Sequence, residues 1–187
     1  MDRLLRLSAG IDWLLTVLAR IGSWAAILLM LVVCYDVVTR HYGVPKPFGL
    51  NSTQIQESEY WLHTILFALV IGYAYLRQAH VRIDLVRGRL PIKAKYIIEM
   101  TGCLLFLIPG ALVIAWLSFG YTMASYNSGE VSKSVIGMSN IWILKAFMPL
   151  MYGLMLLAGI SQFIKSLAGF LGRLPRGREF EARGGDH

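Results

Sequence analysis

Apolar residues dominate four long runs along the chain, and short polar connections separate them. An α-helix rises about 1.5 Å per residue, so about 20 apolar residues cross about 30 Å of hydrocarbon. None of the runs alternates between apolar and polar residues, and a helix satisfies its own backbone N–H and C=O groups in lipid. The pattern therefore predicts an all-α integral membrane protein with a single membrane domain over residues 21–164. Its four predicted spans are Ile21–Val38, Tyr60–Leu76, Met100–Met123 and Ala146–Ile164.

An amphipathic stripe precedes the first run. Leucine and isoleucine recur at helical spacing on one side of residues 1–20, and Arg6 and Arg20 lie opposite. This pattern predicts an interfacial helix on the cytoplasmic surface; the alternative is that the segment extends the first span inward. No small-x-small cleavage motif follows the first run, so we expect that span to be retained. The stripe consists of Leu4, Leu7, Ile11, Leu14, Leu15 and Leu18.

Basic residues are distributed unequally between the two sides of the predicted membrane domain. The N-terminal segment, the connection after the second span and the tail at 165–187 carry 14 Lys and Arg, against 4 elsewhere. Because basic connections stay in the cytoplasm, both termini are predicted to be cytoplasmic. Aromatic residues near the predicted outer ends agree, since amphipathic rings settle at membrane interfaces. They are Tyr35, Tyr42, Tyr60, Trp61, Tyr121, Tyr126 and Trp142.

The composition excludes several classes of protein. With 56% hydrophobic and 16% charged residues and a mean hydropathy of +0.57, the chain is too apolar for an ordinary soluble domain. The net charge of +7 does not indicate nucleic-acid binding, because the basic residues lie between apolar runs rather than on one polar face. Cys34 and Cys103 lie in separate apolar runs, so neither a disulfide framework nor a thiol redox site is expected.

Small residues four positions apart, Ala68/Gly72 and Ala111/Ala115, occur in the second and third spans and permit close contact between helices. The spans show no pair of broken helices and no inverted repeat of the kind that builds a substrate site in the middle of the membrane. We therefore do not expect this chain to transport a solute alone.

An acidic segment leads into the second span, and a charged block follows the end of that span. The first is Gln56-Glu57-Ser58-Glu59-Tyr60-Trp61, and the second is His80-Val81-Arg82-Ile83-Asp84, closed by Leu90-Pro91; Trp142-Ile143-Leu144-Lys145 and Pro149 lead into the fourth span. Together these motifs resemble the small membrane subunit, DctQ-like, of tripartite ATP-independent periplasmic (TRAP) transporters.

The resemblance implies a division of labour among three proteins. A periplasmic solute-binding protein captures an organic anion, such as a dicarboxylate, a 2-oxo acid or a related carboxylate. A large multi-span membrane subunit transports it and binds the coupling ion, expected to be Na⁺. The small subunit braces the large one and helps to dock the binding protein. The resemblance implies no enzymatic activity and no cofactor in this chain, and it leaves the transported solute open.

We interpret His80, Arg82 and Asp84 as a structural corner on the cytoplasmic side rather than as a substrate contact. Asp84 is placed to cap a short interfacial helix over Leu85–Leu90. His80 and Arg82 are placed to bond to the exposed carbonyls at the end of the second span. The block contains no nucleophile paired with a base, so catalysis is not indicated.

Ionisable residues near the outer boundary need partners, because an isolated charge at membrane depth is costly. Asp36 and Arg40 are four residues apart on one helix and are predicted to pair. Glu57 or Glu59 is predicted to pair with Lys145 and so to join the second and fourth spans. The alternative is that the acids bind a coupling cation, which is disfavoured because hard cations need several converging oxygens.

The outward connection Ala124–Asn140 is polar and contains Glu130 and Lys133. Glu130 and Lys133 are therefore candidate contacts for the periplasmic binding protein, although the preferred interpretation is an ordinary solvated loop.

A haem-binding membrane anchor of a redox complex is the alternative function. His41 and His63 lie near the outer ends of the first two spans, where two imidazoles at similar depth can ligate one iron. The transporter is preferred, because His63 suits an interfacial hydrogen bond equally well and no second pair lies farther inward.

Overall fold

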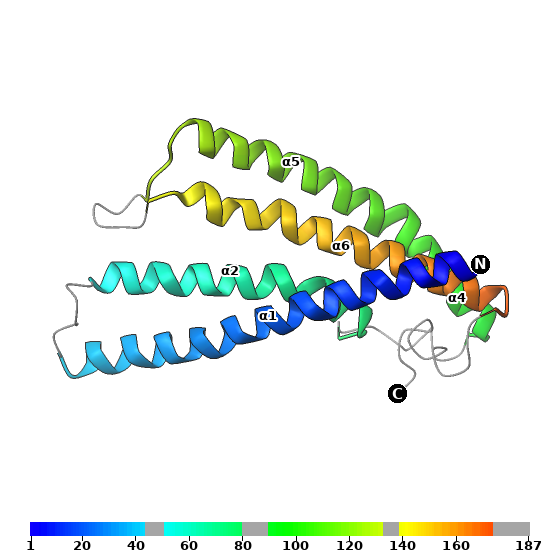
Figure 1. The fold of residues 1–187 in the computed structure, drawn as a ribbon, viewed down its shortest axis with the longest axis horizontal. Coiled ribbons are helices and arrows are strands. Elements are labelled where there is room, and N and C mark those ends of the chain that lie inside the picture. Colours follow the sequence, from blue (N-terminus) through cyan, green and yellow to red (C-terminus); the bar gives the residue numbers. More distant parts are fainter. Residues whose placement is uncertain (44–50, 80–89, 133–138, 174–187) are drawn as a thin grey trace.

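The structure is a computed structural model that describes residues 1–43, 51–79, 90–132 and 139–173. Every regular element in these ranges is helical (Figure 1). The elements are α1 (Asp2–His41), α2 (Ser52–Leu76), α4 (Ile92–Gly102), the π-helical segment η2 (Cys103–Leu107), α5 (Ile108–Asn127) and α6 (Ile141–Phe170). Because α4, η2 and α5 follow one another directly, they form one long helix, Ile92–Asn127.

Four helices in the described ranges are long and apolar enough to cross a membrane: α1, α2, the α4–η2–α5 helix and α6. Each contains one of the four predicted spans and extends beyond it. This confirms the predicted all-α membrane fold.

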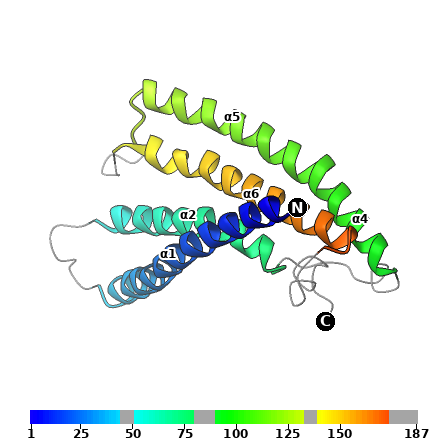
Figure 2. The same ribbon diagram turned by 45° about the vertical axis from the view of Figure 1, so that its right-hand side comes forward.

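Helix α6 lies at the centre of the arrangement. It packs against α1, α2, α4 and α5, whereas α5 packs chiefly on α6. Figure 1 shows α5, α6, α2 and α1 following one another across the molecule, so the helices form an open layer rather than a closed ring. The first turns of α1 cross toward the end of α6 (Figure 2). Helices α1 and α5 are therefore the two edges of the layer.

The N-terminal segment extends the first membrane helix and forms no separate interfacial helix. Helix α1 runs unbroken through 40 residues, which corresponds to about 60 Å. The predicted stripe divides between two environments, because the helix is held against α2 and α6 on one side only. Leu15 is fully buried, with Ile11 and Leu18 packed beside it, while Leu4 and Leu7 are exposed. The short helix predicted over 85–90 falls outside the described residues.

The core lies where α1, α2 and α6 meet, and a small residue allows them to approach. A Cβ atom at Gly72 would lie 3.0 Å from the carbonyl oxygen of Leu154 on α6 and 3.0 Å from Cδ2 of Leu15 on α1. Ala68, one turn earlier, is also buried. In the third span, Ala111 is buried on the side of α5 that faces α6. Small residues thus set the close spacing of the layer.

Candidate functional site

Polar side chains within the described ranges gather at two levels of the helical layer. The outer charge layer consists of Asp36, Arg40, Glu57, Glu130 and Lys145, at the ends of the helices for which the sequence predicts an outward position. The inner polar junction consists of Ser8, Asp12, Ser161 and Lys165, at the opposite end. The first level contains residues that the sequence singled out, and the second contains residues that it did not.

In the outer charge layer, Asp36 and Arg40 pair along α1. Arg40 Nη2 lies 2.6 Å from Asp36 Oδ2, and the aspartate side chain is 7% exposed. With the amide of Gln56 assigned so that its oxygen faces Arg40, this oxygen accepts hydrogen bonds from Nη2 and Nη1 at 2.6 and 3.0 Å. The arginine therefore neutralises a buried acid on its own helix and links α1 to the start of α2.

Lys145 pairs with Glu130. The predicted pair with Glu57 or Glu59 is wrong within the described residues. The reason is the face of α6 on which Lys145 lies. Its ammonium is 4.0 Å from the centre of the Tyr121 ring, and its carbonyl accepts a hydrogen bond of 3.1 Å from Thr122 Oγ1, so it lies on the α5 side. Glu130, in the connection after α5, is held there by a 2.6 Å hydrogen bond from Ser125 Oγ.

Glu57 on α2 is bonded to the same connection. Ser132 Oγ donates a hydrogen bond to Glu57 Oε1. Because Glu130 and Ser132 are two residues apart, the connection after α5 reaches α6 through one residue and α2 through the other. Glu59 is half-buried and has no hydrogen bond or ion pair to any residue in the described ranges. The outer ends of α2, α5 and α6 are therefore joined by one loop.

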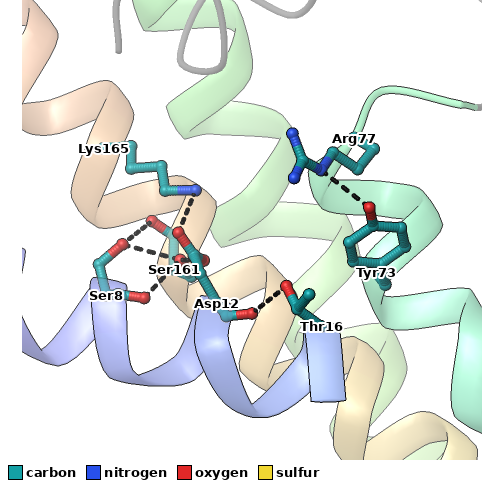
Figure 3. Close-up of polar contacts among 7 residues, drawn as sticks. All are labelled: Ser8, Asp12, Thr16, Tyr73, Arg77, Ser161 and Lys165. Atoms are coloured by element: carbon teal, nitrogen blue, oxygen red, sulfur yellow. Dashed lines mark hydrogen bonds and ion pairs between the residues drawn. The ribbon is translucent and has the colours of Figure 1, made fainter. Parts of the chain in front are cut away.

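The inner polar junction joins α1 to α6 (Figure 3). Lys165 Nζ lies 2.7 Å from Asp12 Oδ2, and Ser161 Oγ donates a 2.6 Å hydrogen bond to Asp12 Oδ1. Ser8 Oγ lies 2.8 Å from Ser161 Oγ. Because the single proton of Ser161 is directed to Asp12, Ser8 is the donor in that contact. Ser8 and Ser161 are fully buried and Lys165 is 2% exposed.

Sequence reasoning missed this junction. Lys165 was counted as the first residue of the basic tail, and Asp12 lies in a segment interpreted as interfacial. The available signal was spacing: Ser8 and Asp12 are four residues apart, as are Ser161 and Lys165, so each pair occupies one face of its helix. A second polar contact, 3.3 Å from Gln162 Nε2 to Glu99 Oε1, joins α6 to α4.

The remaining predicted residues are placed as follows. His80, Arg82, Asp84 and Lys133 fall outside the described residues. The ring of His41 contacts Tyr42 edge-on at 5.0 Å, and the ring of His63 stacks on Phe67 at 4.8 Å. Cys34 is exposed and Cys103 is buried, and neither forms a disulfide. Within the described ranges, no group of three His, Cys, Asp or Glu side chains could hold a metal ion.

The fold and the two polar levels define a class: an integral membrane protein whose four apolar helices form an open layer, with buried Asp36 paired along α1 and buried Lys165 paired from α6 to α1. A family model described as the DctQ component of tripartite ATP-independent periplasmic transporters matches residues 29–169. The chain belongs to this family and is a small membrane subunit of a TRAP transporter. No curated protein and no solved structure matches it.

The family match supports the transporter over the haem-binding anchor, because the matching model describes a transporter component. The matched region contains both sets of outer contacts and the α6 half of the inner polar junction, while Ser8 and Asp12 precede it.

Proposed function

We propose that this chain braces the large transport subunit of a TRAP-type secondary transporter for organic anions in the bacterial inner membrane. The observation that carries the proposal is the open layer of helices. Helix α6 is covered by its neighbours, whereas α1 and α5 each bury one narrow seam and leave broad apolar faces exposed. Such edges suit a chain that lies against a second membrane protein.

Helix α5, at one edge of the layer, has a narrow buried seam and a broad exposed apolar face. Its buried seam consists of small and hydroxyl-bearing residues, which let it approach α6 closely. Its outward side has large apolar rings, with Trp116 at 78% and Phe119 at 57% exposure. We expect the large subunit to cover part of this surface and lipid to cover the rest. The buried residues of the seam are Ala111, Ser118, Thr122 and Ser125.

A brace has to resist distortion, and the polar contacts support this role. The loop with Glu130 and Ser132 ties α5, α6 and α2 together at the outer end. The Asp12–Lys165 pair ties α1 to α6 at the inner end. Because separating these pairs would expose charges to a medium of low dielectric constant, the layer should move as one unit.

The connection after α5 is the part of the chain that we expect to meet the periplasmic binding protein. Glu130 is already engaged by Lys145 and Ser125, so its expected role is to hold the loop in shape. We expect the coupling ion, Na⁺, to bind to the large subunit, because Asp36 and Glu130 are each already paired with a basic side chain of this chain. Both termini are expected to be cytoplasmic.

Reconstitution tests the proposal. The chain, the large membrane subunit and the solute-binding protein encoded with it are purified and combined in liposomes, and uptake of the organic anion bound by that protein is measured under a Na⁺ gradient. We expect the two membrane subunits to co-purify and uptake to require all three proteins. Uptake by this chain alone, or full uptake by the large subunit without it, would contradict the bracing role.

A cross-linking experiment identifies the edge that faces the partner. Photoreactive residues replace Trp116 on α5 and, in a separate variant, Trp24 on α1, which is 70% exposed. A matched control replaces Thr122, which is buried in the seam between α5 and α6. We expect one of the exposed positions, and not the control, to cross-link to the large subunit.

A further inference from the structure

A small polar cavity opens between α1, α2 and α6 beside the inner polar junction. Its volume is about 50 Å³; one water-sized group needs about 10–15 Å³, so it has room for a compact tetrahedral anion. Figure 3 shows five of its lining side chains, with Asp12 and Lys165 on one side and Tyr73 and Arg77 on the other. The lining residues are Asp12, Thr16, Tyr73, Leu76, Arg77 and Lys165.

Arg77 is held in position on the edge of this cavity. Its Nε donates a 3.1 Å hydrogen bond to the hydroxyl of Tyr73, and the guanidinium lies 5.3 Å from the centre of the same ring. The two terminal amino groups have no protein partner in the described part of the chain, and Figure 3 shows them on the Lys165 side. A guanidinium with a free planar fork of donors matches the oxygens of a phosphate.

Tyr73 adds another donor. Its oxygen accepts the hydrogen bond from Arg77, so its own proton is available to a ligand. Thr16 does not contribute in this way, because its hydroxyl donates a 2.7 Å hydrogen bond to the carbonyl of Asp12. The donors directed at the cavity are therefore the Arg77 fork and the Tyr73 hydroxyl.

The balance of charge around the cavity also favours an anion. Two cations, Arg77 and Lys165, face one acid, Asp12. Both carboxylate oxygens of Asp12 are already engaged, one by Lys165 at 2.7 Å and the other by Ser161 at 2.6 Å. Among the described lining residues, cations therefore outnumber acids by one, and the acid is turned to the inner polar junction.

The depth of the cavity matches that of lipid phosphates. The predicted second and fourth spans end at Leu76 and Ile164, and Arg77 and Lys165 are the next residues along the chain. Both cations thus lie at the inner end of the apolar layer, where the phosphates of the cytoplasmic leaflet are found. Basic pockets between membrane helices on this side recognise anionic lipid headgroups.

We propose that this cavity binds a phosphate group, with the Arg77 fork and the Tyr73 hydroxyl as donors and Lys165 as a fixed positive charge. The phosphate has two sources, the headgroup of an anionic phospholipid and free inorganic phosphate. Binding here does not depend on the bracing role, because the donors all belong to this chain.

Native mass spectrometry of the full chain in detergent tests the site. The protein is titrated with phosphatidylglycerol, with zwitterionic phosphatidylcholine and with inorganic phosphate. We expect phosphatidylglycerol or inorganic phosphate to bind in preference to phosphatidylcholine. Arg77→Gln should weaken the affinity for the preferred ligand about fivefold, the effect of one basic residue at the membrane surface. Arg173→Gln is the matched control: it removes one exposed positive charge just beyond α6, away from the cavity.

Two further variants separate a shaped site from general attraction to charge. Arg77→Lys keeps the charge but loses the fork, and Tyr73→Phe loses the hydroxyl while keeping the ring; each should weaken binding by less than Arg77→Gln does. Phosphatidylglycerol that stays bound in excess inorganic phosphate identifies a lipid site, and displacement by phosphate identifies a free-ion site. Equal binding by wild type and Arg77→Gln, or equal losses in Arg77→Gln and Arg173→Gln, would overturn the proposal.

Discussion

Lys165 on α6 directs its ammonium to Asp12 on α1, with 2.7 Å between Nζ and Oδ2 and 3% of the lysine side chain exposed. The two residues are more than 150 positions apart in the sequence, yet they pair where the first turns of α1 cross α6. This contact fixes the position of the N-terminal half of α1, which therefore continues the membrane helix instead of lying on the surface.

Breaking this pair should destabilise the protein. Asp12→Asn leaves a buried ammonium without its carboxylate, and we expect a loss of about 3 kcal/mol, the low end for buried pairs, because 24% of the Asp12 side chain is exposed. The measurement is the fraction of monodisperse protein after heating in detergent. Asp2→Asn, at an exposed position on the same helix, is the matched control and should have no effect.

The double variant Asp12→Asn/Lys165→Met gives a second measurement of the same contact. Because neither partner is then left charged and buried, the double variant should lose less stability than the sum of the two single variants. Additive losses, or a stable Asp12→Asn protein, would show that the pair does not hold α1 against α6.

The outer pair Lys145–Glu130 should act through assembly rather than through ion coupling. Glu130→Gln and Lys145→Met should each lower the yield of complex with the large subunit, and their double variant should show a non-additive loss. Glu59→Gln and Lys145→Met, when combined, should give additive losses in the yield of complex, since Glu59 does not contact Lys145. The half-saturating cation concentration for uptake should stay unchanged; a several-fold shift in Lys145→Met would instead assign this residue to energy coupling.

Gly72 should tolerate no larger side chain. A Cβ atom there would lie 3.0 Å from the backbone oxygen of Leu154, which cannot move without shifting α6. We expect Gly72→Val to cost about 1–3 kcal/mol through overpacking, measured as thermal stability in detergent. Gly10→Ala on α1 is the control, because no atom lies within 4 Å of the added carbon. A Gly72→Val protein as stable as wild type would mean that α2 and α6 are not in close contact.

Topology reporters test the orientation of the helical layer. The start of α1 and the end of α6 lie at the same end of the molecule (Figure 1). From the distribution of basic residues, a fusion at His187 should report the cytoplasm and an insertion after Ser139 should report the periplasm. A periplasmic signal at His187 would reverse the assignment of the outer and inner levels.

The number and type of membrane elements could be predicted from the amino-acid sequence alone. A run of about 20 apolar residues has to form a helix in lipid whatever surrounds it, since its backbone groups find no other partners. The motifs around Glu57 and Lys145 also led to the right family, because their residue types and spacing are visible without knowledge of any contact. The Asp36–Arg40 pair belongs to the same group, since four residues along one helix bring two side chains together.

Which charges meet across helices could not be predicted, because it depends on how the helices pack. Lys145 has neighbours on α2 and α5 at similar depth, and sequence spacing does not distinguish them; the face of α6 that packs on α5 selects Glu130. The same is true of Asp12 and Lys165, which are brought together by the crossing of α1 over α6. Local sequence sets the length and apolarity of each helix, but the rotation and crossing of one helix against another depend on side chains from the whole layer.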